Sequence, residues 1–279
     1  IGDVHPLFKS DEKFRPVVLL EISDKLVTKQ VAARLGRLLV SRKLVDEAHY
    51  GFLPGGNVGI PLRILTTLLE TSRLGGRTKD LYVALIDLVS AYDNVPHDFL
   101  EVAFASIGAP DSFCHWLRAR LFDQRRFVSI AGRLGDPSNT FALEGGLPQG
   151  CPLSPILWVV FMDVMIKAIN AQTAEGDEAQ LGSRGVWSLV YGDDLALPRT
   201  SYKALQQVLD VFGPISAALG QRVNTSKSVY APGARHTGQR KALLISALDQ
   251  QGVLRRKALV TVVHPSSEWG RSLSLGFRN

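Results

Sequence analysis

The feature that most constrains the fold is a pair of short apolar runs joined by a two-residue turn signal. SLVY (188–191) precedes Gly192 and Asp193, and LALP (195–198) follows shortly after. Glycine at the first central position is typical of a type II′ turn, which joins two antiparallel strands. The sequence therefore predicts a β-hairpin that carries two adjacent carboxylates, Asp193 and Asp194, at its tip.

A third acid ends another predicted strand. LYVALID (81–87) is a continuous apolar run, typical of a central buried strand, with Asp87 at its C-terminal end. Carboxylates about 4 Å apart repel by about 4 kcal/mol at an effective dielectric of about 20, so an acid cluster requires protonation, separation or a cation. If the two strands are neighbours, Mg²⁺ would relieve that repulsion. Taken alone, Asp193 and Asp194 could equally be ordinary turn residues.

The rest of the chain alternates between helical and strand-like patterns. An amphipathic helix is predicted from Ser23, as its N-cap, to Leu39. Helical spacing returns at Leu205, and Gly213-Pro214 is expected to kink or interrupt that helix. The other predicted elements are helices over 60–70, 96–107, 113–121 and 155–169, a strand over 125–132 and a loop over 133–140.

Composition narrows the setting of the protein. The net charge of +6 and pI of about 9.4 over 279 residues are a mild indication of a polyanionic partner. Two cysteines, Cys114 and Cys151, supply neither a disulfide framework nor a zinc cluster, so we expect an intracellular location. The apolar run 155–169 contains Asp163 and Lys167 and predicts a buried helix, with no membrane span. Because the chain begins with Ile1, we expect a piece of a longer polyprotein-like product.

Three motifs carry a resemblance to a known family. AYDNVPH (91–97), GGLPQGCPLSP (145–155) and LVYGDDLAL (189–197) occur in this order, and the set resembles the reverse transcriptase domain, particularly that of non-LTR (LINE-like) retrotransposons. The resemblance extends from about Lys9 to at least Lys227. It implies an α+β fold, the fingers and palm of a right-hand polymerase, with an antiparallel palm sheet backed by helices and the thumb absent. The fingers would comprise residues 1–78 and 124–145, and the palm residues 79–123 and 146–279.

The same resemblance assigns a two-metal site. Asp87 and Asp193 would coordinate both Mg²⁺ ions, with Mn²⁺ as an alternative, and Asp194 would complete the cluster. Leu88 is implied both as a metal-binding and as a substrate-binding residue. ALGQRVNTSKSVY (218–230) matches the block that follows the hairpin in these enzymes, which makes Lys227 the candidate general acid for the leaving pyrophosphate.

The implied substrate contacts lie in four other blocks. Tyr92 matches the aromatic residue that lies under the incoming sugar and disfavours a ribose 2′-hydroxyl. The remaining implied contacts are the backbone amides of Ser90 and Ala91, the LPQG residues Gln149 and Gly150, the triphosphate-clamp candidates Lys9 and Arg15, and the template contacts Gly51 and Phe52. Two positions depart from the family pattern, which more often has a charged residue at Ser90 and an arginine at Leu53.

The function implied by the resemblance is RNA-directed DNA polymerisation in a retrotransposon. The expected partners are an RNA template, a DNA primer and dNTPs, with a nuclear location and with further domains, such as a thumb and an endonuclease, in the natural protein. The alternatives are an RNA-dependent RNA polymerase, which also has GDD, and an inactive RNA-binding remnant. Tyr92 and LPQGCPLSP (147–155) favour the reverse transcriptase. LSLGFRN (273–279) weakly resembles a primer grip.

Overall fold

The computed structural model describes most of the first 231 residues. These are residues 2–10, 13–73, 81–123, 125–130, 133–134, 140–171, 173–174, 176–225 and 227–231. The chain forms two compact units: unit 1 comprises residues 1–45 and 90–164, and unit 2 comprises residues 46–89 and 165–279. These boundaries differ from the expected division into fingers and palm, which stays a prediction. The weak primer-grip match lies outside the described residues.

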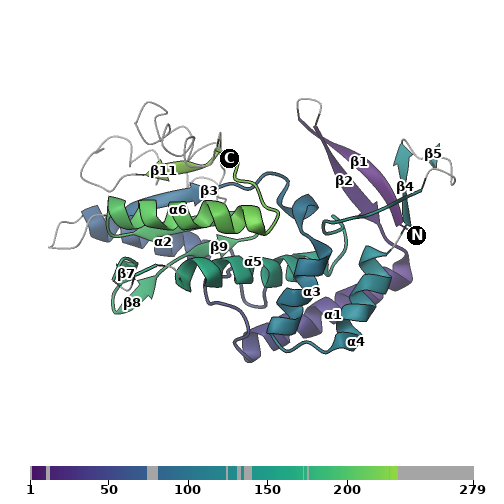
Figure 1. Cartoon of the computed structure of the whole chain (residues 1–279), viewed down its shortest axis with the longest axis horizontal. Helices are drawn as coiled ribbons and strands as arrows, with labels where there is room; N and C mark the ends of the chain where they lie inside the picture. Colours follow the sequence, from purple (N-terminus) through teal and green to yellow (C-terminus); the bar gives the residue numbers. More distant parts are fainter. Residues whose placement is uncertain are drawn as a thin grey trace. The chain divides into compact units, whose positions relative to one another are not determined.

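Unit 1 is built on one mixed sheet with helices. Its strands are β1 (Gly2–Ser10), β2 (Lys13–Leu19), β4 (Arg125–Ile130), β5 (Arg133–Leu134) and β6 (Phe141–Ala142), ordered β2-β1-β4-β5 with β6 also on β4. β1 is antiparallel to β2 and parallel to β4 (Figure 1). The strand predicted over 125–132 is confirmed over residues 125–130, and its last two residues lie outside the described part of the chain. The loop predicted over 133–140 is wrong at its first two residues, because β5 pairs with β4.

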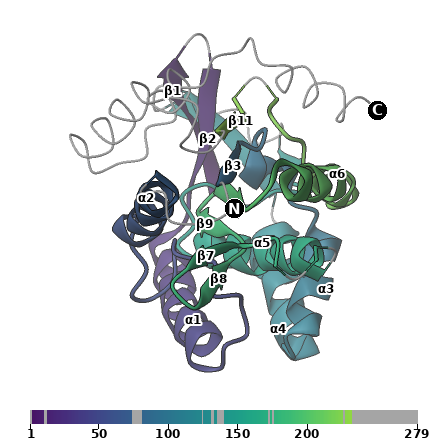
Figure 2. The same cartoon turned by 90° about the vertical axis from the view of Figure 1, so that its left-hand side faces the viewer.

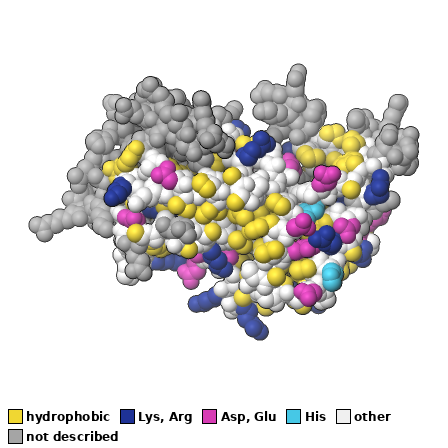
Figure 3. Space-filling view, viewed as in Figure 1, with side chains coloured by type: hydrophobic (Ala, Val, Ile, Leu, Met, Phe, Trp, Pro, Cys, Tyr) yellow, Lys and Arg dark blue, Asp and Glu magenta, His cyan; other side chains and the backbone are white. Residues whose placement is uncertain are grey.

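The helices of unit 1 lie close to the predicted helical segments. They are α1 (Ile22–Ser41), α3 (His97–Ser106), α4 (Asp111–Leu117) with a π-helical extension (Arg118–Phe122), and a 3₁₀ turn (Ala91–Asn94). The Ser23 N-cap prediction is wrong: α1 begins at Ile22, and Glu21 holds the N-cap position without a side-chain cap. Acidic and basic side chains intermingle over α3 and α4 (Figure 3), where Arg118 pairs with Asp98 and Glu101.

Unit 2 contains an antiparallel four-stranded sheet and a small ribbon. The sheet comprises β3 (Tyr82–Ile86), β9 (Leu189–Tyr191), β10 (Asp194–Arg199) and β11 (Val229–Ala231), in the order β11-β3-β10-β9. The ribbon pairs β7 (Ala179–Leu181) with β8 (Arg184–Val186). The predicted strand 81–87 is confirmed as β3, with Leu81 and Asp87 just outside its ends.

Two helices cover the opposite faces of this sheet. They are α2 (Gly59–Arg73) and α6 (Tyr202–Ala218), which lie on either side of β3 in Figure 2. Side chains of a strand alternate between faces. Val83 and Ala196 therefore join the core cluster that Leu65 of α2 completes. Ala84 and Leu197, which are paired in register, point to the other face, and α6 packs there against β3 and β10.

The predicted break at Gly213-Pro214 is wrong. α6 continues through Pro214 to Ala218. Phe212, Gly213 and Ser216 are buried, and the Ser216 hydroxyl donates to the Gly213 carbonyl at 2.9 Å. Burial of this apolar helix face outweighs the one backbone hydrogen bond that a proline removes.

The apolar run 155–169 forms most of α5 (Ser154–Ala171). Among the described residues, this is one helix long and apolar enough to cross a membrane by length and composition. However, 67% of its apolar window is buried inside the protein, and Trp158 is fully buried. Such burial is typical of a core helix.

Candidate active site

The three acids predicted to cluster lie at one end of the strands of the unit 2 sheet, where β3 ends and β9 turns into β10. We call these three residues the acid edge: Asp87, Asp193 and Asp194. In the β3–β10 pair, Ile86 is opposite Leu195, so continuing the register by one residue sets Asp87 opposite Asp194. The β9–β10 register pairs Asp194 with Tyr191, which leaves Gly192 and Asp193 as a two-residue turn. The predicted hairpin and the adjacency of the two strands are confirmed.

The turn requires glycine at its first position. Gly192 has φ +66°, and Asp193 is not among the described non-glycine residues with positive φ, which fits the predicted type II′ turn. A Cβ on Gly192 would lie 3.3 Å from the ring of Phe52. Both the backbone conformation and the neighbouring ring therefore disfavour a side chain at this position.

The acid edge supplies the ligand chemistry of a magnesium site without forming a closed set of ligands. Asp87 is 5% exposed, whereas Asp193 and Asp194 are half-buried. Within the described part of the chain, no group of three or more His, Cys, Asp or Glu side chains is arranged to hold a metal ion. Carboxylate oxygens nevertheless suit Mg²⁺ rather than a softer metal. Leu88 has a buried apolar side chain, so only its backbone carbonyl could contribute.

Asp87 is held by two residues that sequence reasoning missed. The Asn224 side-chain amide donates to Asp87 Oδ2 at 2.9 Å, and the Asn224 backbone N–H donates to the Asp87 carbonyl at 2.8 Å. The Asp87 N–H donates to the Ser228 hydroxyl at 3.1 Å. A signal was available, because Asn224 and Ser228 flank Lys227 within the same matched block.

Lys227 lies in the loop that contacts Asp87. Its side chain is exposed, and its backbone N–H donates to the Asn224 carbonyl at 3.1 Å. The structure thus places the candidate general acid three residues after the amide that contacts Asp87. Its role in proton transfer stays a prediction.

The template candidates Gly51 and Phe52 pack on the hairpin. The preceding residues pair with β9 in a parallel bridge: the Tyr50 N–H donates to the Val190 carbonyl, and the Val190 N–H donates to the Ala48 carbonyl, both at 2.9 Å. A Cβ on Gly51 would lie 2.7 Å from the Gly192 nitrogen. Phe52 has φ +63° and is 45% exposed. A strained, exposed aromatic residue beside the turn is a candidate for ligand contact.

In unit 1, two of the recognised motifs are joined by hydrogen bonds, and we call residues 92–97 with 145–150 the motif clasp. Three bonds have backbone acceptors: the Leu147 N–H donates to the Tyr92 carbonyl, the Gly146 N–H to the Val95 carbonyl and His97 Nε2 to the Gly146 carbonyl, each at 2.8 Å. Gln149 Nε2 adds a fourth, to Asp93 Oδ1 at 3.0 Å. The side chain of Gln149 therefore serves the clasp.

His97 is a structural member of the clasp. Its ring stacks on Phe122 with centroids 3.8 Å apart, and burial lowers the pKa of His97 below its usual value of 6.5. A neutral imidazole that carries its proton on Nε2 satisfies the Gly146 carbonyl.

Tyr92 is held by stacking. Its ring lies nearly parallel to Trp158, with centroids 5.2 Å apart and an interplanar angle of 16°. Nearby, Ser90 is exposed in the left-handed region, with φ 46° and ψ 48°, whereas Ala91 is buried. Left-handed backbone at a non-glycine residue costs energy and is common at ligand sites.

Gly150 lies against the chain's own strand β2. The Val18 N–H donates to the Gln149 carbonyl at 2.7 Å, and a Cβ on Gly150, which has φ +108°, would lie 2.6 Å from the Val18 oxygen. Also on β2, the clamp candidate Arg15 is exposed, opposite Leu7 of β1. Lys9 lies in β1, and its side chain is outside the described part of the chain.

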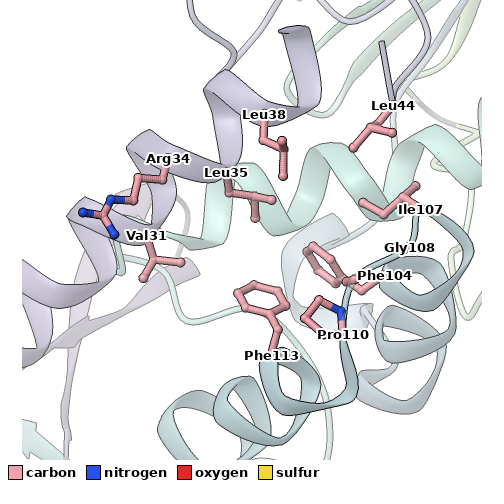
Figure 4. A pocket seen from close by; sticks show the side chains of 11 residues that line it. Val31, Arg34, Leu35, Leu38, Leu44, Phe104, Ile107, Gly108, Pro110 and Phe113 are labelled. Atoms are coloured by element: carbon pink, nitrogen blue, oxygen red, sulfur yellow. The ribbon is translucent and has the colours of Figure 1, made fainter. Parts of the chain in front are cut away.

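Unit 1 also has an apolar cavity of about 300 Å³ between α1 and the α3–α4 turn. In Figure 4, Leu35, Phe104 and Phe113 point into it, while the guanidinium of Arg34 lies at its edge. The cavity is lined by none of the residues predicted for the active site.

Known proteins share both the sequence pattern and the fold. The model of the family described as "Reverse transcriptase (RNA-dependent DNA polymerase)" matches residues 7–241. The chain is 27% identical over 216 residues to a "Retrovirus-related Pol polyprotein from type-1 retrotransposable element R2" of Bradysia coprophila, covering 77% of this chain and 23% of that protein. It is 25% identical to the polyprotein of type-2 element R2DM of Drosophila melanogaster, covering 86% of this chain and 21% of that protein.

A solved structure agrees at the level of the fold. Apo telomerase from Candida tropicalis, truncated from its C-terminal domain, superposes with a TM-score of 0.60 at 16% identity, covering 85% of this chain and 51% of the other. The chain spans about a quarter or less of the R2 polyproteins that it matches. Because the family model covers most of the sequence, the chain belongs to the reverse transcriptase (RNA-dependent DNA polymerase) family.

Proposed function

We propose that the chain is the fingers-and-palm portion of the polymerase of a non-LTR retrotransposon, and that it adds dNTPs to the 3′-hydroxyl of a DNA primer on an RNA template. The observation that carries the proposal is the register of β3 and β10, which brings Asp87 and the hairpin acids to one sheet edge. Convergent carboxylates are what two-metal nucleotidyl transfer requires. The names of the R2 relatives support retrotransposition.

Asp87, Asp193 and Asp194 are the residues that would hold Mg²⁺, or Mn²⁺ in its place, with the carbonyl of Leu88 beside them. When bound, the cations would supply Lewis-acid activation of the primer hydroxyl and charge neutralisation of the phosphates. The all-oxygen donor set supports this choice of metal. The half-burial of Asp193 and Asp194 leaves the hairpin tip accessible to substrate.

The chain's other residues bind and orient the substrates. Tyr92, immobilised on Trp158, would reject a ribose 2′-hydroxyl by steric exclusion. Lys227 would give a proton to the leaving pyrophosphate, which suits its exposed position in the loop beside Asp87. Phe52 and Gly51 would contact the template, and Arg15 and Lys9 the triphosphate; Ser90, Ala91, Gln149 and Gly150 would border the nucleotide.

The test is primer extension on a primed RNA template. Wild type should incorporate dNTPs only with a divalent cation, and Asp193→Asn should lose that activity. Asp210→Asn is the matched control, because Asp210 is an acid of the same unit on α6, hydrogen bonded to Gln206. Equal extension by wild type and Asp193→Asn contradicts the proposal.

Two alternatives are outcomes of the same assay. Preference for rNTPs over dNTPs identifies an RNA-dependent RNA polymerase. Binding of primed RNA without any extension identifies an inactive RNA-binding domain, a reading that the open arrangement of the acid edge keeps relevant. A nuclear location and further domains are also proposed, the latter because the chain covers only 23% and 21% of the two R2 polyproteins that it matches.

A further inference from the structure

The loop that follows α6 bulges around Asp87. On one side, β11 pairs Val229 with Leu85, and on the other side Val223 forms an isolated bridge with Leu88. Residues 86 and 87 of the β3 chain therefore face a longer segment, whose described residues include Asn224, Lys227 and Ser228. This segment runs along the edge of the sheet where β11 lies next to β3 (Figure 1).

Backbone hydrogen bonds fix both ends of this loop. The Ser228 and Lys227 N–H groups donate to the Asn224 carbonyl at 2.8 and 3.1 Å. The Asn224 N–H donates to the Asp87 carbonyl, and the Ser228 hydroxyl accepts from the Asp87 N–H. With its backbone fixed, the Asn224 side chain reaches Asp87 Oδ2 without further ordering of the loop.

An amide is a suitable donor for a carboxylate that must hold a cation. A lysine or arginine in its place would neutralise Asp87 and compete with the metal. The Asn224 amide fixes the orientation of the carboxylate and leaves its full negative charge. Hydrogen bonds of this kind to metal-ligating groups set ligand orientation and metal affinity.

We propose that Asn224 is a positioning residue that sets the orientation of the Asp87 carboxylate for the catalytic cation. This inference rests on the proposed function and deepens it. Asn224 acts through Asp87, and its side chain need not touch substrate. The exposed pair on α6, in which Gln206 Nε2 donates to Asp210 Oδ1 at 2.6 Å, has the same donor and acceptor chemistry and serves as the matched control.

The experiment measures cation binding without catalysis. Mn²⁺ binding to the full chain is followed by electron paramagnetic resonance for wild type, Asn224→Ala, Asn224→Ser and Gln206→Ala. We expect both Asn224 variants to bind Mn²⁺ about 10- to 100-fold more weakly and the Gln206 variant to bind as wild type. The half-saturating Mg²⁺ concentration in primer extension should rise by a similar factor. The affinity for primed RNA in EDTA should be unchanged.

Three results would overturn the inference. The first is wild-type Mn²⁺ affinity in both Asn224 variants. The second is a loss of Mn²⁺ affinity on adding Asn224→Ala to Asp87→Asn that is as large as the loss that Asn224→Ala causes in the wild type. A residue that acts through Asp87 has no additional effect once Asp87 is changed. The third is weaker binding of primed RNA in EDTA by both Asn224 variants, which marks a merely structural role. Wild-type Mn²⁺ binding and extension by Asp87→Asn and Asp193→Asn would instead refute the proposed function.

Discussion

The acid edge of unit 2 and the motif clasp of unit 1 hold their candidate residues in different ways. At the acid edge, strand register positions the carboxylates, and the neighbouring loops supply hydrogen bonds to Asp87, just after β3, and to Val190 in the middle of β9. In the clasp, the motif residues bond to one another: Gln149 contacts Asp93, His97 contacts Gly146, and Tyr92 stacks on Trp158. The motif residues of the two regions therefore have different roles, chemical at the acid edge and structural in the clasp.

Substitutions in the two regions should therefore affect different properties of the protein. Replacing a carboxylate at the acid edge should remove activity, because the lost negative charge is the group that would hold the cation. Replacing a residue of the clasp should first loosen the loops that carry Tyr92 and Gln149. Two matched comparisons between the regions and one within the clasp test this difference, in order of decreasing expected effect.

The first comparison replaces one acid in each region. Asp87→Asn should lower dNTP incorporation by at least about 100-fold, because the site loses a negatively charged ligand for the cations that would neutralise the reacting phosphates. Asp93→Asn should lower it by less than about 10-fold, since asparagine keeps an oxygen for Gln149 and only one exposed hydrogen bond is weakened. Steady-state incorporation measures both. Similar losses in the two variants would erase the proposed distinction.

The second comparison replaces one glycine in each region. Gly150→Ala should lower the free energy of unfolding by about 3 kcal/mol or more, because φ is +108° and the new Cβ would meet the Val18 carbonyl oxygen at 2.6 Å. Gly192→Ala should lower it by only about 1 kcal/mol, since φ is +66° and the partly exposed Phe52 ring can shift. Urea unfolding monitored by tryptophan fluorescence ranks the two, and the reverse order would contradict this account.

The third comparison concerns pH and has the smallest expected effect. Burial is the largest cause of the lowered pKa of His97; Arg118 also lowers it, while the Gly146 carbonyl, Asp98 and Asp123 raise it. As the pH falls, His97 therefore becomes protonated near pH 6.5 in the unfolded chain and only at a lower pH in the folded protein. Stability from His97 is fully present above pH 6.5 and is lost as the pH falls toward its folded pKa.

The variant His97→Gln tests that assignment, because glutamine offers an amide N–H to the Gly146 carbonyl but does not titrate. Thermal midpoints of wild type should fall more steeply between pH 7.5 and pH 5.5 than those of His97→Gln. Parallel curves for the two proteins would show that His97 does not contribute this pH dependence.

Local patterns predicted the elements better than their ends and connections. The apolar run 81–87 and the Gly-Asp turn were sufficient for β3 and the hairpin, because buried strands and tight turns have local signatures. Ser23 was wrong as an N-cap, because α1 begins at Ile22 and Glu21 holds the N-cap position. Pro214 did not end α6, because burial of an apolar helix face outweighs the one backbone hydrogen bond that a proline removes. The strand β5 depended on pairing with β4, which no local pattern reveals.

The candidate site likewise contains residues that the sequence identified and residues that only the structure revealed. Asp87, Asp193 and Asp194 could be named from their motifs, and the adjacency of their strands is confirmed, whereas the roles of the predicted substrate residues stay predictions. Asn224 and Ser228 were missed because their function depends on contacts with Asp87 across more than 130 intervening residues. Short polar residues in a turn have no periodicity that would reveal such contacts.

The sequence by itself determined the chemistry that the chain offers: three acids, an aromatic residue at 92 and the ordered motifs that place the chain in its family. Only the tertiary structure decided which residues support those groups. Asn224 binds Asp87, the loop at 51–52 packs on Gly192, and the two motifs of unit 1 bond to each other. The physical reason is that residue identity and local spacing are encoded along the chain, whereas hydrogen-bond partners between distant segments are fixed only when folding aligns their backbones.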